Sequence, residues 1–137
     1  MSRLDSNRRI KILHVDDDPC VLESTKNILL LDGNFEIDCA VNVQDAFNKI
    51  ANNRYDVVIS DYEMPGKNGL QFLKELREQE NFVPFILFTG KEGVEIATEA
   101  LDLGVEYHVD KHGSLEIVFE KLMHYIRMAV ENSGTNL

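Results

Sequence analysis

The sequence predicts an α/β fold in which parallel strands form one sheet with helices on both of its faces. Five short apolar runs alternate along the chain with segments whose apolar residues recur every three or four positions. The runs are apolar almost throughout, as in parallel strands that are covered on both faces. Right-handed crossovers then leave few topologies. Five βα units favour a flavodoxin-like (βα)5 doubly wound sandwich, a five-stranded parallel sheet in the order 2-1-3-4-5.

Polar or turn-forming residues end each expected strand. The strands are expected at residues 10–15, 35–41, 55–60, 84–88 and 105–109. Asp18 before Pro19 is typical of a helix N-cap, so the first helix is expected to begin there and to end near Gly33. The apolar spacing predicts the other helices at about residues 43–51, 70–76, 94–101 and 115–129.

Length and composition indicate one domain. With 137 residues, of which 44% are apolar, the chain can bury a core without disulfides. Cys20 and Cys39 form no metal-ligand pattern and are expected to be thiols in a reducing compartment. We expect an N-terminal extension at residues 1–9, one domain at residues 10–130 and a flexible C-terminal tail at residues 131–137.

The charge balance limits the partners that the chain can have. There are 24 acidic and 14 basic residues, and the formal net charge is −10. Phosphate backbones repel such a chain, so we expect no direct contact with nucleic acid. The sequence shows no secretory signal and no apolar run long enough to span a bilayer. We therefore expect a cytoplasmic protein without a membrane partner.

Polar residues whose side chains can bind a metal or take part in a reaction follow four of the five expected strands. Asp16 and Asp17 follow the first strand, Asp61 the third, Thr89 the fourth and Lys111 the fifth. The carboxyl ends of parallel strands point the same way, and ligands bind there. Alone, Asp16 and Asp17 are explained equally well as a solvated turn. Together with Asp61 they favour a binding site.

Three neighbouring carboxylates repel one another by about 1–4 kcal/mol per pair at effective dielectric constants of about 80 to 20. A hard divalent cation relieves this repulsion, and oxygen ligands suit Mg²⁺, with Mn²⁺ as an alternative. Lys111 adds an ammonium group and Thr89 a hydroxyl donor. A nucleophilic carboxylate, a metal, a cation and a donor are the parts needed for phosphoryl transfer to Asp61.

Four sequence blocks resemble the signature blocks of the receiver domains of two-component response regulators (CheY-like). They lie at residues 15–19, 60–69 and 88–90 and at Lys111, in the expected order, and the resemblance covers about residues 10–130. The amino-acid sequence of residues 85–91 and 111–113 is similar to that of archaeal receiver domains. The resemblance implies a phosphoacceptor domain of a phosphorelay. Such a domain catalyses only its own phosphorylation and dephosphorylation and is not otherwise an enzyme.

The resemblance also implies roles for the site residues. Asp61 would accept the phosphoryl group from a phosphohistidine on a sensor histidine kinase or a phosphotransfer protein. Asp17 and Asp61, with the backbone carbonyl of Glu63, would bind Mg²⁺, while Asp16 would act largely through water. Thr89 would move toward the phosphoryl group, and Lys111 would pair with it.

Two positions depart from the family pattern. Receiver domains usually have Tyr or Phe three residues before the lysine, where this chain has His108. His108 is either a neutral replacement or a switch residue that makes the output sensitive to pH, because His titrates near pH 6.5. The usual proline after the lysine is replaced by His112. We expect either a trans peptide bond with a rearranged loop or a strained cis bond.

Other implications concern the mouth of the pocket and the partners. Glu63 and Lys91 lie two residues after Asp61 and Thr89, and we expect them to flank the pocket and to pair across it. The output protein is unknown. The resemblance implies a homodimer face made of the fourth helix, the fifth strand and the last helix, within residues 93–130.

Two other classes of function remain as alternatives. A flavodoxin-like cofactor-binding module is disfavoured because acidic residues follow the first strand in place of a phosphate-binding loop rich in Gly, Ser and Thr. In an aspartyl-phosphate phosphatase of the haloacid dehalogenase type, a second aspartate stands two residues after the nucleophile. Here that residue is Glu63.

Overall fold

The computed structural model describes residues 9–90, 105 and 107–135. The strands are β1 (Ile10–Val15), β2 (Phe35–Ala40), β3 (Val57–Ser60), β4 (Phe85–Thr89) and β5 (Tyr107–Asp110). The helices of this part are α1 (Pro19–Asp32), α2 (Val43–Asn52), α3 (Gly69–Glu78) and α5 (Leu115–Thr135). The helix that the sequence predicts at residues 94–101 lies outside the described residues.

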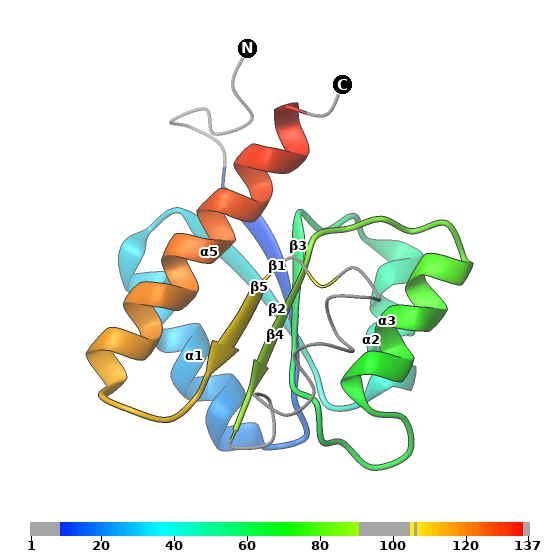
Figure 1. The fold of residues 1–137 in the computed structure, drawn as a ribbon, viewed down its shortest axis with the longest axis horizontal. Helices are drawn as coiled ribbons and strands as arrows, with labels where there is room; N and C mark the ends of the chain where they lie inside the picture. The colour runs from blue at the N-terminus through cyan, green and yellow to red at the C-terminus, as the bar shows by residue number, and fades with distance from the viewer. Residues whose placement is uncertain (1–8, 91–104, 106, 136–137) are drawn as a thin grey trace.

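The five strands form one parallel sheet in the order β2-β1-β3-β4-β5, which confirms the predicted topology. Helices α1 and α5 lie on one face of this sheet, and α2 and α3 lie on the other (Figure 1). All strands therefore present their carboxyl ends to the same edge of the sheet. The loops that carry the candidate site residues meet at this edge.

Two apolar layers hold the helices to the sheet. In β1, Ile10 and Ile12 point toward α1 and α5, whereas Leu13 and Val15 point toward α2 and α3. This alternation follows from the two-residue period of a strand. Each fully buried Leu, Ile or Phe side chain contributes about 1.5–3 kcal/mol. Both layers are thus needed to fix the sheet on which the site is built.

The ends of α1 form as predicted. The Asp18 side chain accepts a hydrogen bond from the Cys20 backbone N–H at 2.9 Å, and Pro19 begins the helix. At the other end Gly33 has φ 81°, and its N–H donates to the Leu30 carbonyl at 3.1 Å. Residues with side chains rarely adopt this left-handed conformation, so glycine is favoured at this position.

Helix α5 is longer than predicted. It continues through Thr135, into the segment where the sequence analysis expects a tail from residue 131. The Asn132 side-chain amide donates to the Tyr107 hydroxyl at 2.9 Å, and the Tyr107 ring stacks on Tyr125 at 4.9 Å between centroids. The sequence analysis overlooked these contacts, which join the last turns of the helix to β5.

The bounds of β2, β3, β4 and β5 differ from the prediction by one or two residues, most at the starts of β3 and β5. Strand β3 begins at Val57, after Tyr55 and Asp56, which contact other elements through their side chains. The Tyr55 hydroxyl donates to the Asp38 carboxylate at 2.6 Å, and the Lys11 backbone N–H donates to the Asp56 carboxylate at 2.8 Å. Strand β5 occupies Tyr107–Asp110 rather than residues 105–109. These shifts leave the loops at the carboxyl ends of the strands in place.

Candidate phosphorylation and metal site

An open cleft of about 660 Å³ lies at the carboxyl ends of β1 and β3. Asp16, Asp17 and Asp61 line it together with Glu63 and Lys111, so the structure brings these five predicted residues together. Thr89 ends β4 as a buried residue, but it is not among the residues that line the cleft. Lys91 lies outside the described residues.

The three aspartates offer carboxylate oxygens that all lie within 4.8 Å of one another. Asp16 is only 1% exposed, Asp61 is partly buried, and Asp17 is exposed to solvent. Charges this close repel strongly where burial lowers the effective dielectric constant. A donor set made of oxygen atoms, with one side open to water, fits a hard divalent cation such as Mg²⁺.

Asp16 is fixed by backbone and side-chain hydrogen bonds. One carboxylate oxygen accepts from the Asp18 backbone N–H at 2.9 Å, and the other accepts from the Lys111 ammonium at 2.7 Å. Burial raises the pKa of the Asp16 carboxyl above its ordinary value, although Lys111 and the Asp18 N–H oppose this shift. Asp16 is the most buried of the three aspartates, so its negative charge costs the most free energy when no cation lies beside it.

Lys111 lies between two of the carboxylates. Its ammonium is 2.7 Å from Asp16 Oδ2 and 3.2 Å from Asp61 Oδ2, and it lies 5.5 Å from the centre of the Phe88 ring. Burial alone would lower the pKa of Lys111, but the hydrogen bonds and charges of the two carboxylates outweigh burial and raise it. The ammonium therefore stays charged and partly balances the acidic cluster.

Asp61 follows β3 and is held by the backbone around it. Its N–H donates to the Val15 carbonyl at 2.9 Å, which links the ends of β1 and β3. Its Oδ1 accepts from the Tyr62 backbone N–H at 2.7 Å, while Oδ2 faces Lys111. The two carboxylate oxygens thus have different partners, and the structure distinguishes them before any ligand binds.

His14 lies in β1 beneath the site and contacts Phe88, with 6.1 Å between ring centroids. It is fully buried, and neither ring nitrogen has a hydrogen-bond partner in the part of the chain that the structure describes. Burial, helped by the charge of Lys111, lowers the pKa of His14 to about 3. A neutral His14 therefore packs as an apolar ring against Phe88.

The two departures from the expected pattern have distinct outcomes. His108 pairs with Leu87 in the sheet and is half-buried, and burial lowers its pKa, an effect that Asp110 opposes. The Lys111–His112 peptide bond is trans, so the strained cis bond is not the alternative observed. The His112 backbone N–H donates to the Asp110 carboxylate at 2.8 Å, and Gly113 has φ 116°.

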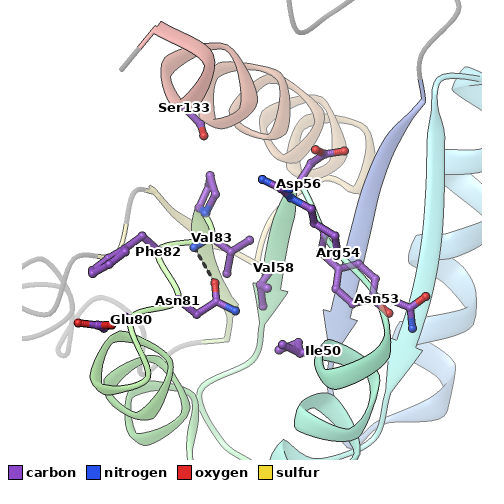
Figure 2. Close-up of a pocket in the computed structure, with 12 residues that line it drawn as sticks. Ile50, Asn53, Arg54, Asp56, Val58, Glu80, Asn81, Phe82, Val83 and Ser133 are labelled. Atoms are coloured by element: carbon purple, nitrogen blue, oxygen red, sulfur yellow. Dashed lines mark hydrogen bonds between the residues drawn. The ribbon is translucent and has the colours of Figure 1, made fainter. Parts of the chain in front are cut away.

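A second hollow, of about 480 Å³, lies at the opposite end of β3 and β4 (Figure 2). Side chains from the loops before these strands surround it, among them Arg54, Asn81 and Phe82, and Ser133 of α5 closes one side. It contains none of Asp16, Asp61 and Lys111. The predicted aspartates therefore lie at the first cleft and not at this hollow.

The sequence analysis missed three contributors to the site. Phe88, Ser60 and Gly69 are members of the signature blocks at residues 88–90 and 60–69, but the sequence predicts no separate role for any of them at the site. The last two contact the backbone of Asp61: the Ser60 hydroxyl donates to its carbonyl at 2.9 Å, and Gly69 packs directly on that carbonyl. The signal available in the sequence is a serine at the end of an apolar run, directly before Asp61.

Comparison with known proteins gives a consistent result. A family model described as "Response regulator receiver domain" matches residues 12–123. Response regulator MprA from Mycobacterium sp. (strain KMS) is 30% identical over 125 residues, which are 91% of this chain and 54% of MprA. The chain thus spans about half the length of this curated relative.

Solved structures agree with this match. The receiver domain of Francisella response regulator 1452 superposes with a TM-score of 0.81 at 26% identity, covering 91% of this chain and 99% of that one. Response regulator TrrA from Thermotoga maritima, solved in complex with Mg(2+)-BeF, has a TM-score of 0.75 at 31% identity, covering 88% of this chain and 98% of that one.

No helix in the described part of this chain is long and apolar enough to cross a membrane.

Proposed function

Because this chain belongs to the response regulator receiver domain family of two-component systems, we propose that it accepts a phosphoryl group on the carboxylate of Asp61. The observation that carries the proposal is the placement of Asp61 within 4.8 Å of Asp16 and Asp17, with Lys111 bridging two of the three acids. This arrangement supplies a nucleophile with a cation beside it, in a cleft open to a donor.

The proposed metal is Mg²⁺, and Mn²⁺ fits the same oxygen ligands. Asp17 and Asp61 with the backbone carbonyl of Glu63 would hold it directly, and Asp16 largely through water. When bound, such an ion offsets the negative charge on the transferring phosphoryl oxygens. The complex of TrrA with Mg(2+)-BeF supports this part of the proposal.

In the proposed reaction an Asp61 oxygen attacks the phosphorus of a phosphohistidine. An O–P bond forms as the bond from phosphorus to the donor's imidazole nitrogen breaks, and the electron pair leaves with that nitrogen. Lys111 turns from carboxylate to phosphoryl oxygen, and the Thr89 hydroxyl supplies a further donor. The only catalysis proposed for this chain is its own phosphorylation and dephosphorylation.

Phosphorylation would act as a switch because it adds about −1.5 to −2 charges and three acceptor oxygens. Thr89 and Lys111 gain contacts only in that state, so the loops that carry them are biased toward a new arrangement. We propose His108, on the strand between these loops, as the residue that carries the change toward the output face. Glu63 and Lys91 would pair across the pocket mouth and slow the approach of water.

The proposed partners are a sensor histidine kinase or phosphotransfer protein as donor and an output protein that reads the phosphorylated face. That face, also a candidate homodimer interface, combines β5 and α5 with the predicted fourth helix, which lies outside the described residues. The net charge of −10 supports the absence of direct nucleic-acid contact by this segment. The free thiols Cys20 and Cys39 support a cytoplasmic location.

The test is incubation with acetyl phosphate and Mg²⁺, followed by mass spectrometry of the intact chain and its peptides. We expect one phosphoryl group on Asp61, none in Asp61→Asn, and wild-type labelling in the control Asp32→Asn, which removes an acid that pairs with Arg127 away from the cleft. A stable label on another residue, or no label, contradicts the proposal. Turnover of acetyl phosphate without a stable label on Asp61 would instead indicate a phosphatase.

A further inference from the structure

The peptide group that follows Asp61 is held from the β3 side by Ser60. Ser60 is fully buried, and its hydroxyl donates to the Asp61 carbonyl at 2.9 Å. A buried hydroxyl usually finds an acceptor, and many would serve. Here the acceptor is the carbonyl of the phosphoacceptor itself, so the bond restricts rotation of the Asp61–Tyr62 peptide.

The same peptide is held from the α3 side by Gly69. A Cβ atom at position 69 would lie 2.3 Å from the Asp61 carbonyl oxygen, so only glycine allows this approach. The Gly69 backbone N–H also donates to the Tyr62 carbonyl at 2.8 Å. The backbone of residues 61 and 62 is therefore fixed by contacts from both sides, one from the strand and one from the helix.

This fixed peptide sets the direction of the reactive carboxylate. The Tyr62 N–H belongs to the Asp61–Tyr62 peptide and donates to Asp61 Oδ1 at 2.7 Å. With Oδ1 held there, Oδ2 points to Lys111 at 3.2 Å. A rotation of the peptide would move its N–H and release Oδ1. The orientation of both oxygens thus depends on the contacts made by Ser60 and Gly69.

We propose that Ser60 and Gly69 are positioning residues for phosphoryl transfer, which hold the Asp61–Tyr62 peptide so that one carboxylate oxygen is bound by its N–H and the other faces Lys111. The inference rests on the proposed function of Asp61 and adds residues to it that touch neither metal nor phosphoryl donor. The alternative is that the Ser60 hydroxyl serves only the stability of the core. Removal of the Ser60 hydroxyl should disturb the orientation of the Asp61 carboxylate if Ser60 is a positioning residue, but not if the hydroxyl serves only the stability of the core.

The test compares Ser60→Ala with wild type in the full chain. We expect about a tenfold lower rate constant for phosphorylation by acetyl phosphate at saturating Mg²⁺, since small misplacements of reacting groups are costly. In the metal-free protein, the Tyr62 amide proton should move upfield in the NMR spectrum as its short bond to a carboxylate weakens. Ser60→Thr keeps the hydroxyl and should restore both signals.

Thr25→Val is the matched control. Its hydroxyl is also fully buried, lies on α1 and has no partner in the described part of the chain, so its removal should change neither rate nor Tyr62 shift. Denaturant titration corrects each rate for the folded fraction. A wild-type rate in Ser60→Ala, or a slower rate without a shift at Tyr62, overturns the inference alone. Absence of phosphorylation in the wild type overturns the proposed function and this inference with it.

Discussion

At the scale of single residues, Lys111 partly balances the charge of the acidic cluster. It is 21% exposed and pairs with an Asp16 side chain that is 1% exposed. Breaking a fully buried pair costs roughly 3–5 kcal/mol. The cleft is open to water, so we expect Lys111→Met to lower the metal-free free energy of unfolding by about 2–3 kcal/mol. The same change should raise Mg²⁺ affinity, because the ammonium and the ion compete for the same carboxylates.

Urea unfolding with and without Mg²⁺ measures both effects of Lys111→Met. Lys67→Met is the control, since Lys67 forms an exposed pair with Glu75 and its loss should cost about 0–1 kcal/mol without changing Mg²⁺ affinity. Weaker Mg²⁺ binding in Lys111→Met would show that the lysine helps to build the metal site and does not compete with the ion.

His108 should make stability depend on pH. Burial lowers its folded-state pKa below the ordinary value of 6.5, so the unfolded chain takes up a proton first as the pH falls. The contribution of His108 is therefore fully present above about pH 6.5 and is lost as the pH falls toward the folded-state pKa. We expect His108→Phe to flatten the fall in unfolding free energy between about pH 8 and 5.5.

The comparison of His108→Phe with wild type isolates this contribution. His14, whose pKa burial lowers to about 3, adds a similar dependence that persists in both proteins. Parallel curves for the two proteins would reject a pH role for His108 in the fold. Binding of an output partner over the same pH range then tests whether that dependence reaches the output.

At the scale of elements, the start of α3 positions the loop that crosses the cleft. The Asn68 side chain accepts from the Gln71 N–H at 2.9 Å, and the Gln71 side chain accepts from the Asn68 N–H at 2.7 Å. This capping box satisfies two donors at the helix end. Asn68→Ala should lower the free energy of unfolding by about 1 kcal/mol. Asn68→Asp, which retains the cap, should cost much less in the same denaturant titration.

The elements also show what the sequence could and could not predict. The alternation of apolar, strand-like runs with helix-like segments was enough to predict the sheet order. The acids after β1 and β3 were enough to predict the Asp cluster, because parallel strands align their ends. The bonds from Ser60 to its neighbour's carbonyl and from Tyr62 to Asp61 Oδ1 depend on peptide orientations that no periodicity encodes. The extension of α5 depends on Tyr107, a residue 25 positions before its partner Asn132.

At the scale of the whole molecule, binding of Mg²⁺ should stabilise the fold. An ion that binds only the folded state adds about 2.7 kcal/mol at a concentration of 100 times its dissociation constant. Asp17→Asn should remove most of this gain while slightly raising metal-free stability, because it deletes one of three repelling charges. A smaller stabilisation by Mg²⁺ together with a higher metal-free stability distinguishes loss of a metal ligand from general destabilisation of the fold.

The neighbouring residue provides the control for this prediction. Asp18→Asn also removes one exposed negative charge beside the cleft but preserves the N-cap of α1, since Asn caps helices as well as Asp does. Its response to Mg²⁺ in thermal unfolding should match that of the wild type. An equal loss of the Mg²⁺ response in both variants would mean that general charge, and not ligation by Asp17, attracts the ion.

The length of α5 has a mechanical consequence. Its last turns pass the edge of the sheet (Figure 1), and its 21 residues correspond to a rod of about 31 Å. If the rod pivots at the end near Lys111, a tilt of about 5° displaces the far end by roughly 3 Å. The hydrogen bond from Asn132 to Tyr107 ties that far end to the start of β5, so such a tilt must either break this bond or move β5 with it. A tilt of α5 that begins beside Asp61 would therefore be felt at Tyr107, at the opposite end of the sheet.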